Sequence, residues 1–431
     1  MYASLSRFSF SVVVMACLAG CGGSSNSSST GGGGTGGGGT PTTVTYTFTG
    51  AMPTAVATQI GAGAYTQASL ESGKLSISVP SGTTKYSAAW VCPADTSSNP
   101  PQNDERVVQA SVQDGTSFSW YCFDANVSKG TATVQVNASA ISGGASVGVY
   151  GNVGVNGAGI GLPWSSSTLN LSGEMFAGTY DVFATVYDAK GNLLAVKILR
   201  DQTIPGALNG GNPVVFAASD EVTSQPLTVN NIPAGFSPSM ALVNYETATY
   251  GNSLDLNFGL NGLTQYTAFP SAAMQSGDYY VFLVGAYGST TPNLGESVGA
   301  EMTSTSSGPQ TIALPAPWSY AGPTPAALPT FNFSYTGFSG MADVQQVAGV
   351  QWQQGTTSTQ HIQMSATASY QNGATSMTIP DLSGLTGFFA PAPAGTSVFW
   401  FASVDQGWAV LSYSTNGTLY TVANSGTYTE P

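Results

Sequence analysis

Val44-Thr45-Tyr46-Thr47-Phe48-Thr49 is the stretch that best indicates how this chain folds, because apolar and hydroxyl side chains alternate strictly along it. A period of two places the apolar residues on one face of an extended strand and the polar residues on the other. The stretch therefore predicts a strand with one buried face. The same period recurs at Leu75, Ile77 and Val79, at Tyr180, Val182, Ala184 and Val186, at Tyr280, Phe282 and Val284, and at Val398, Trp400, Ala402 and Val404.

Turn signals separate the alternating stretches. Asn-Gly is favoured in type I′ hairpin turns because both central positions of such a turn take positive φ. No stretch has the sustained 3.6-residue apolar period of an amphipathic helix. The sequence therefore predicts an all-β protein. Asn-Gly occurs at Asn156-Gly157, Asn209-Gly210, Asn261-Gly262, Asn372-Gly373 and Asn416-Gly417.

Two glycine motifs recur in constant order along the chain. The recurrence predicts four tandem units of about 90 to 105 residues, the size of an immunoglobulin-like or transthyretin-like β-sandwich. The alternative is that a small residue followed by Gly is simply what any hairpin turn uses. The motif that introduces an apolar strand contains Gly82, Gly178, Gly277 and Gly395, and the motif that precedes it contains Gly50, Gly143, Gly235 and Gly337.

The motifs place the units at residues 44–130, 131–224, 225–314 and 330–431. Between the last two lies a proline-rich segment, 315–329. Proline fixes φ and is unsuited to a central strand, so we expect a semi-rigid connector here. The segment from Leu75 to Cys92 is similar to bacterial carboxypeptidase-regulatory-like sandwich repeats, from which we carry over no function.

The N-terminal segment has a different character. Arg7 precedes an apolar run from Phe8 to Ala16, which is the layout of a bacterial secretory signal. Leu18-Ala19-Gly20-Cys21 resembles the lipobox of bacterial lipoproteins, and this resemblance implies cleavage before Cys21 and attachment of lipid to its sulfur. The alternatives are an ordinary secretory signal and a membrane-spanning helix. A spanning helix needs about 20 apolar residues, more than this run supplies.

Residues 22–43 are almost wholly Gly, Ser and Thr and should form a flexible tether with an average reach of about 25 Å. We therefore expect a signal peptide at 1–20, a lipidated cysteine and linker at 21–43, and a body exported to the cell envelope. Acyl chains such as palmitate would anchor it to the membrane. Gly22 after the lipidated cysteine resembles lipoproteins sent onward to the outer membrane of Gram-negative hosts.

Cys92 and Cys122 are the cysteines that remain after the N-terminal segment. Two cysteines in an exported protein predict one disulfide. Trp90 and Trp120 each stand two residues before a cysteine, so on strands they share its face and should pack beside the bridge.

The chain is acidic, with a net charge of −13 and 8 Lys and Arg residues. Such a charge excludes a basic nucleic-acid surface, and the sequence has no phosphate-binding Gly-Lys-Ser/Thr motif, so we expect no nucleotide and no cofactor. His361, the single histidine, is predicted to face solvent, which leaves histidine-based catalysis and zinc unsupported. Asp188-Ala189-Lys190-Gly191-Asn192 predicts a hairpin turn rather than a calcium loop. The carboxylates that a glycoside hydrolase could use are predicted to be turn or strand-surface charges: Asp181, Asp188, Glu246, Asp255 and Asp278.

Exposed aromatic side chains are what a binding function could use. Candidate ligand-binding aromatics are Trp164, Trp318, Trp352 and Trp408, with core packing as the alternative for each. Three hypotheses follow. The first is a non-enzymatic, lipid-anchored scaffold or adhesion protein with envelope proteins or glycans as partners. The second is a carbohydrate-binding module that uses these tryptophans. The third is an envelope glycoside hydrolase with two catalytic carboxylates.

Overall fold

The computed structural model describes residues 40–96, 99–124, 128–153, 156–163, 168–248, 253–259, 261–288, 295–338, 344–407 and 417–431. These residues are almost entirely in strands and loops, which confirms the predicted all-β fold class. Among them the one α-helix is the four-residue α2 (Ala368–Gln371). None of the described helices is long and apolar enough to cross a membrane.

The strands fall into four groups in chain order, which we call the first to fourth units. The first unit contains β1 (Thr42–Gly50), β2 (Ala55–Ile60), β3 (Thr66–Gln67), β4 (Lys74–Val79), β5 (Lys85–Asp95), β6 (Gln102–Ser111) and β7 (Ser117–Cys122). The second contains β8 (Lys129–Asn137), β9 (Ser146–Val153), β10 (Asn156–Pro163), β11 (Leu169–Phe176), β12 (Gly178–Tyr187), β13 (Leu193–Ile204), β14 (Gly206–Ala207) and β15 (Val214–Val215). The third contains β16 (Thr223–Asn230), β17 (Ser237–Glu246), β18 (Ser253–Gly259), β19 (Gln265–Ala268), β20 (Tyr279–Tyr287), β21 (Gly295–Ser304) and β22 (Gln310–Ala313). The fourth contains β23 (Thr330–Asn332), β24 (Val344–Gln354), β25 (Ser358–Thr367), β26 (Ser376–Thr378), β27 (Ser397–Gln406) and β28 (Gly417–Thr429). Short 3₁₀ turns are η1 (Val112–Asp114), η2 (Leu208–Gly211), η3 (Ala218–Asp220) and η4 (Ser271–Ala273).

One strand order repeats in all four units. Each has an antiparallel run of four strands, in the orders β3-β2-β5-β6, β10-β9-β12-β13, β18-β17-β20-β21 and β25-β24-β27-β28. Each also has a smaller sheet in which the first strand of the unit pairs antiparallel with the fourth strand, as β1 with β4, β8 with β11, β16 with β19 and β23 with β26. In the first three units that first strand also pairs parallel with a later strand. The chain therefore builds one supersecondary pattern four times.

The glycine motifs mark equivalent points of this pattern. Gly82, Gly178, Gly277 and Gly395 each stand at or just before the third strand of a four-strand run, and all four have positive φ. In three units the glycine lies in the same hydrogen-bonded turn. Thr83 N donates to Pro80 O at 3.0 Å, Asp278 N donates to Gln275 O at 3.1 Å, and Thr396 N donates to Pro393 O at 3.1 Å. Glycine is favoured at such a position because it adopts positive φ without steric cost. The exact unit boundaries stay a prediction.

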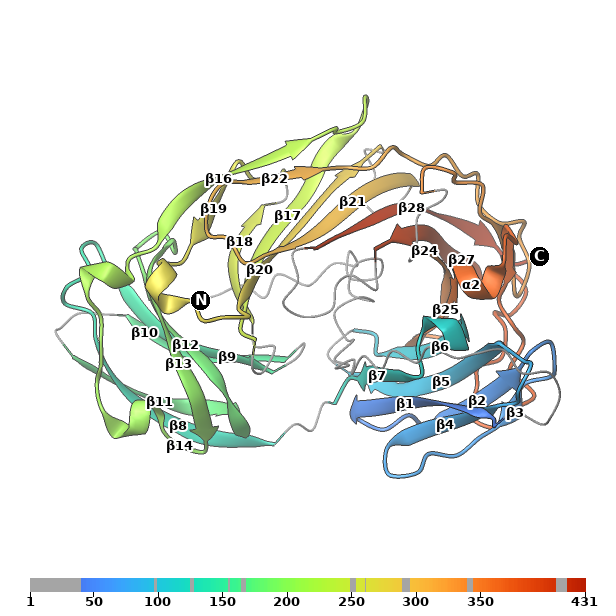
Figure 1. The fold of residues 1–431 in the computed structure, drawn as a ribbon, viewed down its shortest axis with the longest axis horizontal. Coiled ribbons are helices and arrows are strands. Elements are labelled where there is room, and N and C mark those ends of the chain that lie inside the picture. The colour runs from blue at the N-terminus through green and yellow to red at the C-terminus, as the bar shows by residue number, and fades with distance from the viewer. Residues whose placement is uncertain are drawn as a thin grey trace.

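Three of the four units share a single sheet. The order β18-β17-β20-β21-β28-β27-β24-β25-β6-β5-β2-β3 joins the third, fourth and first units into 12 hydrogen-bonded strands. The third and fourth units meet through the antiparallel pair β21 and β28. The fourth and first units meet through the parallel pair β25 and β6. Figure 1 shows this sheet as an arch that runs from the yellow strands through the red ones to the blue ones. Edge pairing of this kind satisfies backbone groups that an isolated sandwich would leave exposed.

The second unit packs on the third without joining its sheet. Phe183 of β12 is fully buried and lies 6.2 Å from the ring of Tyr245 and 6.5 Å from that of Phe269, centroid to centroid. The apolar residues between the two sheets of the second unit form a separate core. In Figure 1 the second unit therefore closes one end of the arch, opposite the first unit.

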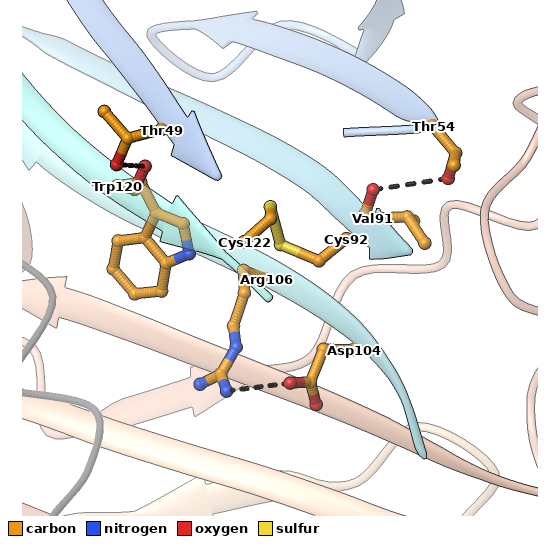
Figure 2. Close-up of a disulfide and its surroundings, with 8 residues drawn as sticks. All are labelled: Thr49, Thr54, Val91, Cys92, Asp104, Arg106, Trp120 and Cys122. Carbon is orange, nitrogen blue, oxygen red and sulfur yellow. Dashed lines mark hydrogen bonds and ion pairs between the residues drawn. A yellow bond between two sulfur atoms is a disulfide. The ribbon is translucent and has the colours of Figure 1, made fainter. Parts of the chain in front are cut away.

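The disulfide predicted between Cys92 and Cys122 is present, with the two Cα atoms 5.4 Å apart. It links β5 of the larger sheet to β7 of the smaller sheet in the first unit (Figure 2). Trp90 is fully buried, and its ring centroid lies 4.9 Å from that of Trp120. The tryptophans therefore pack together next to the bridge, as the sequence predicts, and the bridge ties the two layers of this sandwich.

Candidate functional site at the junction of the first and fourth units

Two of the tryptophans considered for ligand binding lie in the core. Trp318 and Trp352 are each 3% exposed. The ring of Trp318 stacks on that of Tyr320 at 4.9 Å, and Trp352 packs from β24 into the same core. An aromatic ring covered in this way has no free face for a ligand, so this burial does not agree with the ligand-binding interpretation. Trp164 and Trp408 lie outside the described residues.

His361 is buried, so the prediction that it faces solvent is wrong. Its side chain is 1% exposed, and its Nδ1 lies 2.6 Å from Oδ1 of Asp104. The two residues are opposite each other in the parallel pair that joins β25 to β6. Two residues further along the same register, Arg106 donates a hydrogen bond to Gln363 and forms an ion pair with Asp104 at 3.4 Å. A row of polar side chains therefore crosses the seam between the fourth and first units; Figure 2 shows its Asp104 and Arg106 beside the disulfide.

The burial of His361 follows from the position of its strand. β25 is the outermost strand of the fourth unit's own run, so within that unit its side chains have neighbours on one side only. Here β24 and β6 flank it on both sides, and every residue from Thr359 to Gln363 is less than 9% exposed. Alternation in the sequence identifies two faces, but it does not say whether another unit covers the polar one.

The Asp104–His361 pair resembles half of a catalytic triad in geometry alone. Burial by itself would raise the pKa of Asp104, but Arg106 and His361 hold that pKa well below its usual range. A nucleophile would have to lie on the other ring nitrogen. Among the described residues Nε2 of His361 is buried and has no hydrogen-bond partner. Since His361 belongs to the fourth unit and Asp104 to the first, their contact links the two units.

Further polar contacts hold the same seam. Asp114 accepts hydrogen bonds from the hydroxyls of Thr367 at 2.7 Å and Ser369 at 2.6 Å. On the other face of β6, Glu105 accepts a hydrogen bond from Phe389 N at 2.9 Å. Burial raises the pKa of Glu105 to about 7, although the bond from Phe389 opposes this shift. The first and fourth units are therefore joined by side chains as well as by the backbone ladder.

Two of the carboxylates predicted as surface charges form a buried cluster at the other junction. Asp181 and Asp278 are 1% and 2% exposed, so the surface prediction is wrong for both. Arg200 lies between them, with Nη1 2.9 Å from Asp181 Oδ2 and Nη2 2.5 Å from Asp278 Oδ2. Tyr245 also donates to Asp278, at 2.6 Å. Arg200 and Asp181 belong to the second unit and Asp278 to the third, so the cluster clamps the two units together.

The remaining predicted carboxylates differ from one another. Glu246 is 8% exposed and accepts a hydrogen bond from the Tyr279 hydroxyl at 2.5 Å, so it too departs from the surface prediction. Burial raises the pKa of Glu246. Asp255 lies exposed on β18. Asp188 is half-buried in the hairpin between β12 and β13, where it accepts hydrogen bonds from the backbone nitrogens of Lys190 and Asn192, both at 2.8 Å, which confirms the predicted turn.

The sequence offered little sign of these clusters. Arg200 is one of 8 basic residues and shares its strand with Lys197, and no sequence signal distinguishes the cation of the buried cluster from its more exposed neighbour. Across the described ranges, no group of three or more His, Cys, Asp or Glu side chains is placed to hold a metal ion.

Comparison with known proteins identifies no relative that assigns a function. No known family matches the sequence, and no curated protein matches it. A leucine-rich repeat protein from Bacteroides thetaiotaomicron aligns with 44% of this chain and 26% of its own, at 10% identity and a TM-score of 0.17. The Bacillus anthracis TIE protein aligns with 64% of this chain and 50% of its own, at 9% identity and a TM-score of 0.15. The chain thus spans half or less of these two structures, and likeness at this level carries no functional argument.

Proposed function

We propose that this protein is a lipid-anchored, non-enzymatic scaffold of the bacterial cell envelope that presents a rigid body for display or adhesion. The lipobox-like Leu18-Ala19-Gly20-Cys21 and the tether at 22–43 support the anchor. They lie outside the described residues except at the end of the tether. Lipid on Cys21 would hold the body at the membrane, and the tether would let it stand about 25 Å away on average.

The observation that carries the scaffold proposal is the 12-stranded sheet shared by three units. Sandwiches joined only by linkers move relative to one another, because inter-domain motion is the default when contacts are small. Here backbone ladders run through both junctions of the sheet, and the Arg200 cluster fixes the second unit to the third. Such a body holds surfaces of different units at fixed separations, which suits a protein that acts by position.

Two measurements on the full chain test this proposal. Metabolic labelling with palmitate should mark the wild type and Cys17→Ala but not Cys21→Ala, because only the second substitution removes the acceptor sulfur. Cys21→Ala should also leave the membrane fraction. Label that persists in Cys21→Ala would contradict the anchor.

The rigid body is tested by calorimetry of the lipidated chain in detergent. Units that share one sheet should unfold in a single cooperative transition, with equal calorimetric and van't Hoff enthalpies for the third, fourth and first units. Separate transitions for these units would contradict a scaffold of fixed geometry while leaving the anchor intact.

A further inference from the structure

A groove lies where the fourth unit meets the first, on a different part of the seam from His361. Its volume is about 450 Å³, and it opens to solvent. Loops of the first unit form most of its wall, and α2 of the fourth unit supplies an aromatic ring. The lining residues are Gln59, Gly61, Ala62, Gly82, Thr83, Thr84, Lys85, Gln109 and Tyr370.

The hollow results from glycine-containing turns. Gly82 has a φ of 85° in the turn that begins β5, and a Cβ added to it would meet no atom within 4 Å. Gly61 has a φ of 57°, and its N–H donates to Lys85 O at 2.9 Å. Val112 N also donates to Thr84 O at 2.9 Å. The backbone of the wall is therefore fixed by hydrogen bonds while the missing side chains leave room above it.

The aromatic side of the groove is held in place by contacts between units. Tyr370 lies in α2, whose first turn is capped by the side chain of Thr367, and Tyr370 N donates to that hydroxyl at 3.3 Å. Asp114 of the first unit in turn accepts bonds from Thr367 and Ser369. The ring is thus positioned against the first unit before any ligand arrives, which lowers the entropy lost on binding.

Among the described residues that line the groove, Lys85 is the one with a charged side chain. Its Nζ lies 5.2 Å from the centroid of the Tyr370 ring, and within the described part of the chain it forms no ion pair. A cation over an aromatic face is a modest interaction, about 0.5–1 kcal/mol at an exposed site. The ammonium is therefore available to an acidic group, which would bind it more strongly than the ring does.

The other polar groups of the groove are neutral. Gln59 is already oriented, since its Oε1 accepts from Ser87 at 2.9 Å and its Nε2 donates to Gly63 O at 2.7 Å, which leaves a second amide hydrogen. Gln109 and the hydroxyls of the two threonines complete a wall that can both donate and accept. Amides, hydroxyls and one half-buried aromatic ring suit a sugar, which offers many hydroxyls and an apolar ring face.

We propose that this groove binds an acidic saccharide, with a sugar carboxylate on Lys85 and the sugar ring against Tyr370. The net charge of −13 does not oppose this at short range, because charges more than about 8 Å apart are largely screened at physiological salt. Binding should weaken as salt is raised. The proposal goes beyond the scaffold function and does not depend on the lipid anchor.

Calorimetric titration of the full chain in detergent tests the proposal, with an oligogalacturonate as probe and a neutral galactose oligomer of equal length as comparison. The wild type should bind the oligogalacturonate at least about ten-fold more tightly than the neutral oligomer. Lys85→Gln should remove that difference, and Tyr370→Ala should weaken both by about ten-fold. Thr84→Trp should fill the groove and abolish binding, while Thr133→Trp, on the exposed face of β8, should not.

Any one of the following results would overturn the proposal. No binding of the oligogalacturonate by the wild type would remove the site, and equal binding of the neutral oligomer would remove the role of Lys85. Unchanged binding in Thr84→Trp would place the ligand elsewhere. Each variant is compared with the wild type by melting temperature, so that loss of binding is separated from loss of fold. Palmitate labelling and membrane fractionation are unaffected by all these outcomes.

Discussion

Replacing Arg200 with methionine should destabilise the protein strongly, because it leaves two buried carboxylates without their cation. Asp181 and Asp278 have side chains that are each 1% exposed, whereas that of Arg200 is 17% exposed. Removal of one partner from a buried ion pair costs about 3–5 kcal/mol. Asp278 keeps hydrogen bonds from Tyr245, Gln275 N and Ala248 N. Because of these remaining donors we expect the lower end of the range, a loss of about 3 kcal/mol.

The assay is urea unfolding of wild type and Arg200→Met, with Lys197→Met as the matched control on the same strand. Lys197 pairs with Asp220 at 3.0 Å, but these side chains are 33% and 16% exposed, so its replacement should cost less than about 1 kcal/mol. Replacing Arg200, Asp181 and Asp278 together with Met, Asn and Asn should recover most of the loss, since no buried charge then remains. Equal effects of Arg200→Met and Lys197→Met would refute the reasoning.

The loss of stability caused by Arg200→Met should also depend on pH, and it should be smaller at lower pH. Burial would raise the pKa of Asp278, but hydrogen bonds from Arg200 and Tyr245 hold it below its ordinary value. In the wild type this carboxylate therefore contributes stability above about pH 4, the unfolded pKa, and loses it as pH falls further. In Arg200→Met burial is no longer opposed by the guanidinium, so the carboxylate takes up a proton more readily. The difference in unfolding free energy between the wild type and Arg200→Met should become smaller as the pH falls from 7 to 4. A difference that grows over this range would contradict the role assigned to Arg200.

Three other predictions concern the units themselves. Replacing Cys92 and Cys122 with serine should lower the free energy of unfolding by about 3.5 kcal/mol in urea, because the bridge closes a loop with a separation of 30 residues; a loss below about 1 kcal/mol would count against it. The raised pKa of Glu105, about 7, means that the folded state holds its proton more tightly than the unfolded state, so stability should fall as pH rises from about 4.5 through 7. Glu105→Gln should flatten that part of the melting-temperature profile, and an unchanged profile would show that other groups cause it. Gly349→Ala should cost about 1–3 kcal/mol, since the new Cβ would lie 2.1 Å from Cε1 of Phe401, whereas Gly384→Ala, with no atom within 4 Å, should be nearly neutral by the same assay.

Much of the fold could be predicted because its determinants are local. The alternation around Tyr46 becomes β1, whose burial pattern alternates from Val44 to Phe48. Gly82 and its equivalents recur at matching points of the strand pattern, as the repeated glycine motif predicts, and all four take positive φ. Cys92 and Cys122 form the expected disulfide. The strand and the turns depend on residues close in sequence. The disulfide depends on there being two cysteines after the N-terminal segment, so that each has one possible partner.

The candidate sites could not be predicted in the same way. His361 and Asp104 are far apart in the chain and meet only because β25 pairs with β6. Arg200 and Asp278 meet only because the second unit packs on the third. The groove likewise needs Tyr370 from the fourth unit beside Lys85 from the first. Burial of a polar residue depends on which unit covers it, and alternation along one strand does not contain that information.

The sequence by itself determined the strands, their turns, the fourfold repetition and the disulfide, because side-chain period, glycine conformation and cysteine number act within one unit. The tertiary structure decided that β21 pairs with β28 and β25 with β6, so that three units share one sheet. Any strand edge presents the same backbone donors and acceptors, so hydrogen bonding alone does not specify which edges join. That choice rests on side chains brought together from distant parts of the chain. The β25–β6 pairing creates the Asp104–His361 contact and the groove, and the packing of the second unit on the third creates the Arg200 cluster.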